Sequence, residues 1–172
     1  MKKPKILVVG DLMIDHYLWG SCERISPEAP VQVVDIKKET TVLGGAGNVI
    51  NNLIALNCDV FVLSAIGDDA TGAELSKMLL LAGAKSLLAV EQDRKTSKKS
   101  RIIAAHQQVV RYDNESKNDV QEQTQNHIIE KFKNLIGDVD VVLLSDYGKG
   151  VLAKNLCEKL IKIANEHNKK VL

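Results

Sequence analysis

The sequence is poor in aromatic residues and almost neutral overall. Its 172 residues include one Trp, three Tyr and two Phe, and the formal net charge is +1 at pH 7. A nucleic-acid or anionic-membrane partner requires an attractive field of positive charge, and single-stranded nucleic acid also requires aromatic rings for base stacking. We therefore expect neither nucleic acid nor a membrane among the partners of this protein.

Cysteine is also scarce. Cys22, Cys58 and Cys157 are odd in number and widely spaced, without a CxxC pair or a Cys/His combination. Such spacing argues against a disulfide framework and against a zinc site. The four histidines show no ligand spacing either, so we predict no bound metal and a reduced, cytoplasmic protein.

Long hydrophobic runs are absent. The apolar stretch Ile6–Val9 is too short for a signal sequence, and no segment approaches the ~20 apolar residues of a membrane span. With 45% apolar and 26% charged residues, the chain has the composition of an ordinary globular domain with one sizeable core. One domain over residues 1–172 is the expectation.

Strand and helix patterns alternate along most of the chain. Continuous apolar runs predict strands that are covered on both faces, as in parallel sheets, and apolar residues at helical spacing predict helices between them. The sequence Thr71–Glu74 has the form of a capping box, and Gly83 suits the end of the helix that follows. We predict strands over 5–9, 59–65 and 139–145, and helices over 47–56, 71–82, 120–136 and 153–167. This order indicates an α/β fold with a mostly parallel sheet flanked by helices.

Three β-rich stretches lack intervening helices: Val31–Ile36, Lys99–Ala105 and Gln107–Tyr112. They predict a small antiparallel lid, formed by residues of about 14–40 and 97–113, which covers a cleft or pairs with a second copy to make a homodimer. A basic cluster without aromatic neighbours is interpreted as a solvated edge of this lid: Arg94, Lys95, Lys98, Lys99 and Arg101.

A glycine-rich run, Gly44-Gly45-Ala46-Gly47-Asn48, follows the N-terminal strand and its two aspartates. Glycines allow the main chain to approach a polyhydroxylated ligand, while Asp11, Asp15 and Asn48 are able to orient hydroxyl groups. This combination points to a sugar-binding cleft. The alternative interpretation is a tight turn with a helix cap at the glycines, and a turn or cap at Asp15.

Several segments carry a family resemblance. In addition to the glycine run, they are Val9–Asp15, Arg24–Val31, Gln107–Asp113 and Ser145–Gly150. In content, order and spacing they resemble the ribokinase-like carbohydrate kinases, and the Arg24–Val31 segment is similar to the branch that phosphorylates heptose 7-phosphate. The resemblance covers essentially all of this chain, and it implies the ribokinase-like fold, truncated before its nucleotide-binding half.

The resemblance also implies roles for individual residues. Asp11 and Asp15 are expected to bind sugar hydroxyls, Arg111 to pair with the distal phosphate of the substrate, and Lys149 to hold anionic phosphate. Gly44, Gly45 and Asn48 are expected to line the sugar site at a helix start. For Arg111 a solvated surface charge is the alternative, and for Lys149 a turn with a local ion pair to Asp146.

The implied reaction is transfer of the γ-phosphoryl group of ATP to the anomeric C1 hydroxyl of heptose 7-phosphate, on the route to the ADP-heptose of lipopolysaccharide. The Gly-Ala-Gly-Asp stretch that carries the catalytic base of the family is missing from these 172 residues. We therefore expect an acceptor-sugar half without a catalytic residue, inactive alone. ATP and Mg²⁺ are expected for the complete enzyme, and neither is expected to bind tightly here.

Other functions remain open. A dinucleotide-binding oxidoreductase is not favoured, because Gly45–Ile50 lacks the third glycine of GxGxxG and no glycine cluster follows the first strand. A kinase for another phosphosugar or for a nucleoside is an alternative, since hydroxyl-orienting residues do not name a sugar. A non-catalytic module for sugar binding or dimerisation is a further one.

Overall fold

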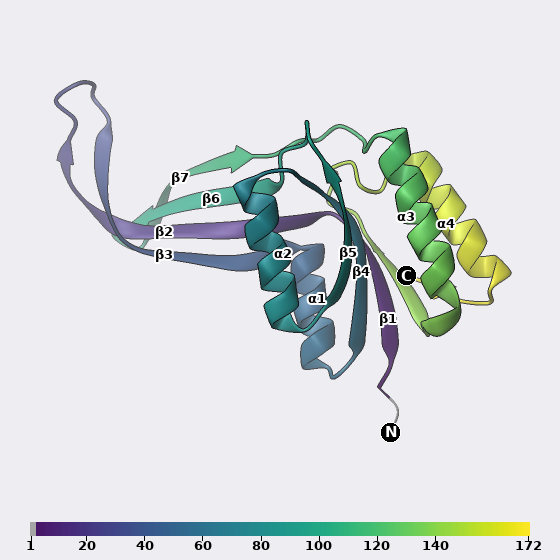
Figure 1. Ribbon diagram of the computed structural model, residues 1–172. Coiled ribbons are helices and arrows are strands. Elements are labelled where there is room, and N and C mark those ends of the chain that lie inside the picture. Colours follow the sequence, from purple (N-terminus) through teal and green to yellow (C-terminus); the bar gives the residue numbers. More distant parts are fainter. Residues whose placement is uncertain (1–2) are drawn as a thin grey trace.

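Two β-sheets organise the chain in the computed structural model, which describes residues 3–172 (Figure 1). The first, sheet A, contains five parallel strands in the spatial order β5 (Lys85–Glu91), β4 (Asp59–Gly67), β1 (Lys5–Gly10), β8 (Val141–Ser145) and β9 (Lys170–Val171). The predicted parallel sheet is confirmed. Its central strand β1 is the first strand of the chain.

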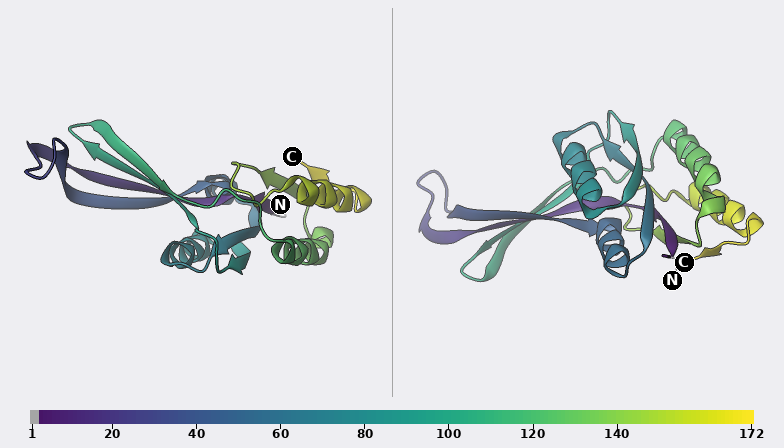
Figure 2. Two further views of the ribbon diagram at one scale, coloured as in Figure 1. Left: turned by 90° about the horizontal axis from the view of Figure 1, so that it is seen from above. Right: turned by 60° about the horizontal axis from the view of Figure 1, so that its bottom comes forward.

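Helices cover both faces of sheet A: α1 (Ala46–Ala55) and α2 (Ala70–Ala82) on one, α3 (Glu122–Leu135) and α4 (Lys154–Glu166) on the other (Figure 2). Alternate residues of β1 divide between two cores. Leu7 and Val9 pack with α3 and α4, whereas Ile6 and Val8 pack with α1 and α2. These strands are therefore apolar at every position, as the sequence indicated.

The second sheet, sheet B, forms the lid and projects from one end of the helix-covered body (Figures 1 and 2). Its strand order is β3 (Gln32–Gly45), β2 (Leu12–Ile25), β6 (Ser97–Ala104) and β7 (Gln107–Asn114). The hairpins β2–β3 and β6–β7 are antiparallel, and a parallel pairing between β2 and β6 joins them. The lid is thus a mixed sheet rather than a purely antiparallel one.

The base of the lid is fastened to the body. Leu12 and Ile14 of β2 and Leu43 of β3 belong to the same core as α1 and α2. Only Asp11 separates β1 from β2, so the lid continues directly from the central strand of the body. Asp15, which the sequence placed near the end of the first strand, lies within lid strand β2 instead.

Several element boundaries differ from the predicted ones. Helix α2 is capped by Asp69, whose carboxylate accepts a hydrogen bond from the Gly72 N–H at 2.7 Å, and not by Thr71. Asp is as good an N-cap as Ser or Thr, and its position lets the helix begin one residue earlier than Thr71. Gly83 ends α2 at φ 90°, as predicted. Strand β5 was not predicted.

The end of helix α3 tightens into a 3₁₀ turn over Ile136–Asp138, which contains the glycine expected to terminate it. Within residues 3–172, none of the helices is both long enough and apolar enough to cross a membrane.

Candidate functional site

The candidate site begins at Asp11, at the carboxyl end of β1. Its carboxylate is fully buried and accepts three backbone hydrogen bonds, from Tyr147 N at 2.8 Å, Lys149 N at 3.0 Å and Val151 N at 3.0 Å. All three donors belong to the loop between β8 and α4, residues 146–153. Asp11 therefore anchors this loop, and the geometry gives no support to its predicted direct contact with a sugar hydroxyl.

Asp15 and the glycine run do lie together. The strands β2 and β3 pair Met13 with Gly44 and Asp15 with Val42. A side chain at Gly44 would collide with the Asp15 carboxylate, so the glycine makes the room that this carboxylate occupies. Gly45 adopts φ 55° at the N-cap of α1, a conformation that glycine tolerates without strain. Asn48 lies exposed in the first turn of that helix.

Arg101 is the partner of Asp15, and the sequence analysis did not place it in the site. Its Nη1 lies 2.7 Å from Asp15 Oδ1, and its guanidinium lies 5.2 Å from the centre of the Tyr17 ring. The hydrogen bond to Asp15 raises the pKa of Arg101 although burial acts against it. The pairing arises because β2 and β6 run parallel and place Tyr17 opposite Arg101.

The same register brings together a row of charged residues across the lid. Asp15 stands opposite Lys99, which stands opposite Asp113, and Arg101 stands opposite Arg111. Lys99 Nζ lies 3.1 Å from Asp113 Oδ2, and Arg111 Nε lies 3.1 Å from Asp113 Oδ1. Residues that face each other in adjacent strands project from the same side of a sheet. Arg111 therefore shares one lid face with Asp15, as a common site requires.

Lys149 joins this face through Glu115. Its Nζ lies 2.9 Å from Glu115 Oε1, and Lys99 Nζ lies 3.3 Å from the other oxygen of that carboxylate. The side chains of Lys149 and Glu115 are 14% and 6% exposed, so the ion pair is largely shielded from water. The local ion pair with Asp146, which was the alternative interpretation of Lys149, is replaced by this longer-range contact. Glu115 is a second residue that the sequence analysis missed.

The cluster on the lid face contains both cations and carboxylates, and the carboxylates hold the cations in place by ion pairing. Burial acts to raise the pKa values of Asp113 and Glu115, but hydrogen bonds and charges from the surrounding lysines and Arg111 outweigh burial and lower both. Both groups are therefore carboxylates at neutral pH. Five cations stand against three carboxylates: Lys99, Arg101, Arg111, Lys117 and Lys149 against Asp15, Asp113 and Glu115. The excess of positive charge favours an anionic ligand.

The predicted solvated basic edge is wrong for part of that cluster. Arg94 is buried, and the Lys99 side chain is 15% exposed. Arg94 contacts Glu91 and two backbone carbonyls, as described below. The physical reason is that Lys99 pairs with Asp113 and Glu115 and that Arg94 donates to two distant backbone carbonyls. Such long-range partners leave no trace in a local charge pattern.

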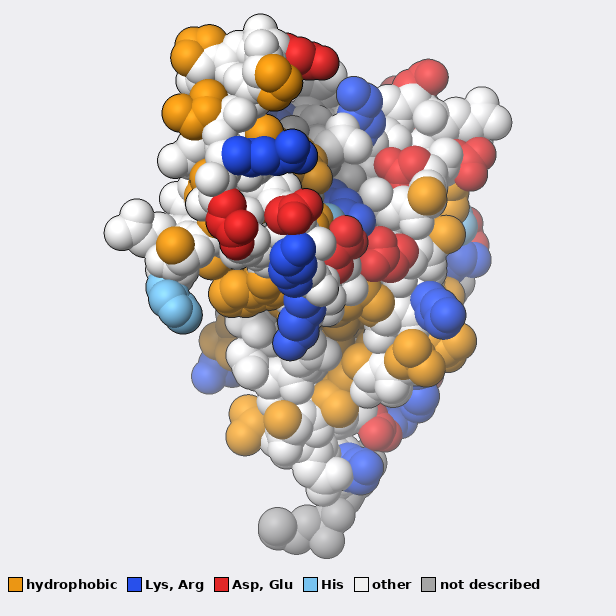
Figure 3. All heavy atoms as spheres, turned by 90° about the vertical axis from the view of Figure 1, so that its left-hand side faces the viewer, with side chains coloured by type: hydrophobic (Ala, Val, Ile, Leu, Met, Phe, Trp, Pro, Cys, Tyr) orange, Lys and Arg blue, Asp and Glu red, His pale blue; other side chains and the backbone are white. Residues whose placement is uncertain are grey.

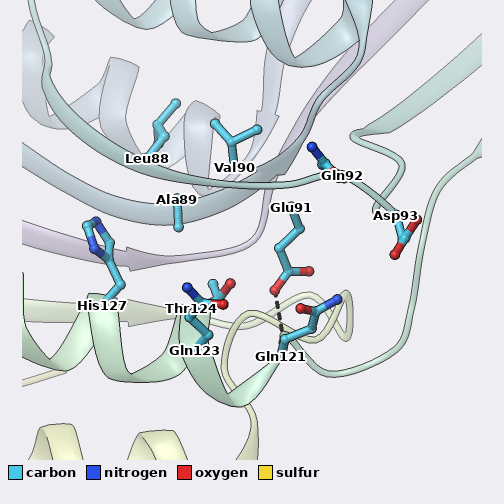
Figure 4. Close-up of a pocket in the computed structure, with 10 residues that line it drawn as sticks. All are labelled: Leu88, Ala89, Val90, Glu91, Gln92, Asp93, Gln121, Gln123, Thr124 and His127. Atoms are coloured by element: carbon cyan, nitrogen blue, oxygen red, sulfur yellow. Dashed lines mark hydrogen bonds between the residues drawn. The ribbon is translucent and has the colours of Figure 1, made fainter.

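A cavity of about 520 Å³ lies elsewhere, between β5 and the start of α3 (Figure 4). Its lining includes Glu91, Gln121 and His127 but none of the predicted site residues. We assign the candidate site to the charged lid face, because the groups with sugar and phosphate chemistry meet there. Within residues 3–172, no three His, Cys, Asp or Glu side chains gather in a way that would hold a metal ion.

Comparison with known proteins shows the family of this chain. The model of the pfkB family carbohydrate kinases matches residues 3–172, and the chain belongs to that family. A protein named Bifunctional protein HldE from Aliarcobacter butzleri (strain RM4018) is 58% identical over 172 residues, which cover 99% of this chain and 36% of that protein. Its namesake from Sulfurimonas denitrificans (strain ATCC 33889 / DSM 1251) is 55% identical over 170 residues, which cover 98% and 36%. The chain thus spans little more than a third of these relatives.

Solved structures show the same fold. Phosphofructokinase-2 from Escherichia coli in complex with fructose-6-phosphate superposes with a TM-score of 0.73 at 15% identity, over 100% of this chain and 54% of that one. A carbohydrate kinase from Agrobacterium tumefaciens gives a TM-score of 0.69 at 21% identity, over 98% and 52%. At these identities the likeness concerns the fold alone. The expected ribokinase-like architecture is confirmed.

Proposed function

We propose that this chain forms the acceptor-sugar side of a kinase that transfers the γ-phosphoryl group of ATP to the C1 hydroxyl of a heptose 7-phosphate. The observation that carries the proposal is the shared lid face of Asp15, Arg111 and Lys149. A carboxylate suited to orient hydroxyls stands in one surface with cations suited to bind a phosphate. The kinase relatives and the sequence resemblance of Arg24–Val31 to the heptose branch favour this acceptor.

Each residue has a distinct part in the proposed binding mode. Asp15 accepts hydrogen bonds from sugar hydroxyls beside Gly44, where no side chain intervenes. Arg111 and Lys149 neutralise the distal phosphate, with Arg101 and Lys99 beside them. The phosphate then replaces the carboxylates that hold these cations in the unliganded protein. Gly45 and Asn48 line the sugar at the start of α1. Holding the acceptor in this way lowers the barrier by positioning, on which phosphoryl transfer strongly depends.

ATP and Mg²⁺ belong to the complete enzyme in this proposal. ATP supplies the phosphoryl group, and Mg²⁺ neutralises the charge that develops during its transfer. We assign no residue of this chain to either, because the family's Gly-Ala-Gly-Asp stretch is not among these 172 residues. The 172-residue chain alone therefore binds the sugar phosphate without turnover. Since ATP and phosphosugars are cytoplasmic metabolites, we place the protein in the cytoplasm.

Calorimetric titration with heptose 7-phosphate tests the site. We expect Asp15→Asn to weaken binding roughly 10- to 150-fold, because a hydrogen bond to a charged group contributes about 1.5–3 kcal/mol. Asp35→Asn is the matched control: Asp35 lies in lid strand β3 and pairs with the exposed Lys37 at 3.0 Å. Equal affinity in wild type and Asp15→Asn would refute the assignment, and turnover of radiolabelled ATP by the 172-residue chain would refute its inactivity.

A homodimer through the lid is the second part of the proposal. The lid exposes an unusual number of large apolar side chains: Trp19, Ile25, Val31, Ile36, Val109, Val110 and Tyr112. In the view of Figure 3, hydrophobic side chains lie between basic and acidic ones over the side where the lid projects. Exposed apolar area of this kind marks an interaction surface. Sedimentation of the calorimetry samples would show a dimer, and a monomer at micromolar concentration would contradict it.

A further inference from the structure

Arg94, which follows strand β5, makes three hydrogen bonds with one buried guanidinium. Its side chain is 6% exposed. Nε donates to Glu91 Oε2 at 2.9 Å, Nη1 to the Lys149 carbonyl at 3.0 Å and Nη2 to the Asn118 carbonyl at 2.7 Å. The three acceptors come from three different segments of the chain, so this side chain ties them together.

The loop that carries Lys149 is therefore held from two sides. The Lys149 N–H donates to Asp11, while the Lys149 carbonyl accepts from Arg94. Its neighbour Gly150 adopts φ 84°, and its carbonyl accepts a hydrogen bond from Val120 N at 2.9 Å. Because both the N–H and the carbonyl of Lys149 are hydrogen-bonded, the position of its Cα atom is restricted.

The same guanidinium holds the segment that follows Glu115. Asn118 lies three residues beyond Glu115, whose carboxylate pairs with Lys149 Nζ. Arg94 thus contacts the backbone next to both ends of the Lys149–Glu115 ion pair. A displacement of either loop would change the separation of these two charged groups.

Glu91, which binds Arg94, also accepts a hydrogen bond from the backbone of Gln121 (Figure 4). Its Oε1 accepts from Gln121 N at 2.8 Å, while Oε2 binds Arg94. Burial acts to raise the pKa of Glu91, but hydrogen bonds from Thr124, Arg94 and Gln121 outweigh it and lower the pKa. A buried ion pair contributes little net stability in general. Because each of the three guanidinium nitrogens of Arg94 donates a hydrogen bond, a role in geometry explains the pair better than a role in stability.

We propose that Arg94 is a positioning residue that sets the location of the Lys149 ammonium group for the phosphate of the acceptor. This inference rests on the proposed function of the charged lid face. Arginine is required because its planar fork reaches three acceptors in fixed directions, whereas a lysine ammonium is a single point charge. Arg94 itself does not touch the substrate.

The test uses the complete natural polypeptide that contains this chain. We expect Arg94→Lys to raise the dissociation constant for heptose 7-phosphate, measured by calorimetry, about tenfold, and to raise the KM for the sugar phosphate while the KM for ATP stays within about twofold. Phe132→Leu, in the core between α3 and sheet A, is the matched control for lost stability without loss of the loop contacts. It should bind as the wild type does.

A double-mutant cycle separates positioning from general damage. If Arg94 acts through Lys149, then Arg94→Lys adds little in a Lys149→Met background. A tenfold effect that persists there, or wild-type affinity of Arg94→Lys, overturns the inference.

Hydrogen exchange provides a readout without ligand. The amides of Tyr147, Lys149 and Val151 should exchange faster in Arg94→Lys than in the wild type, and unchanged exchange overturns the inference. Absence of sugar-phosphate binding by the wild type would instead refute the proposed function, while the exchange rates still decide whether Arg94 orders the loop.

Discussion

The body and the lid differ in how far their strands are buried. In the body, strands such as β1 and β4 are almost wholly buried, and helices cover both of their faces. In the lid, all eight residues of β7 are exposed, and β3 is largely exposed until it reaches the body. Packing accounts for the residues of the body. Packing does not account for a row of paired charges across three lid strands, for which we propose a ligand-binding role.

The sharpest contrast concerns the cost of removing an aromatic ring. Phe132 of α3 is completely buried, whereas Tyr112 of β7 is 52% exposed. For the dissociated monomer, we expect Phe132→Ala to lower the free energy of unfolding by about 3–5 kcal/mol and Tyr112→Ala to change it by about 0.5 kcal/mol or less. Urea denaturation measures both. Similar losses in the two variants would show that the lid is as tightly packed as the body.

A smaller loss is expected where the two regions meet. Asp11→Asn replaces one carboxylate oxygen by an NH₂ group, which leaves at least one of three backbone donors without an acceptor. An unpaired buried donor costs about 1–3 kcal/mol. We expect a loss of that size in urea denaturation, with faster hydrogen exchange at residues 147–151. A variant as stable as the wild type would show that the loop is held without Asp11.

The smallest effect concerns acid stability. The pKa of Glu91 in the body lies below its ordinary value of 4.5. Such a group stabilises the folded state above the unfolded pKa, and this contribution is lost as the pH falls through the folded pKa. We therefore expect stability to decline below about pH 4.5, and less steeply in Glu91→Gln.

Asp35→Asn is the lid control for this measurement. The pKa of Asp35 is also lowered, first by the hydrogen bond from Lys37, but this pair is exposed and screened by salt. The acid profile of Asp35→Asn at physiological ionic strength should match that of the wild type. If the free energy of unfolding falls equally steeply with pH in the wild type and in Glu91→Gln, Glu91 is not a source of acid sensitivity.

The fold was largely predictable because local sequence patterns identify most of the strands and helices of the body. Continuous apolar runs marked β1, β4 and β8, and helical spacing marked α2 and α4. Strand β2 was harder, since polar residues such as Asp15 and His16 interrupt its apolar positions and its partner β6 lies some eighty residues away. The short strand β5 follows α2 after only two residues, Gly83 and Ala84, so no separate turn signal set it apart.

The candidate site was predictable only in part. Asp15, Arg111 and Lys149 were identified through motifs, and their ligand-binding roles stay predictions. Arg101 and Glu115 were missed because their partners are set by the parallel register of β2 and β6 and by a loop crossing, neither of which leaves a local pattern. Arg94 was taken for a surface charge for the same reason. An Arg that lies three residues after a Glu at the end of a strand was the available signal.

The single residue between β1 and β2 has a mechanical consequence. A lid tethered by a flexible loop would swing independently of the domain beneath it, but here the two sheets share one uninterrupted run of backbone. The residue that joins the sheets is also the one whose carboxylate accepts the backbone hydrogen bonds of the loop that carries Lys149. The base of the lid and the loop that carries Lys149 are therefore fixed to the same point of the backbone.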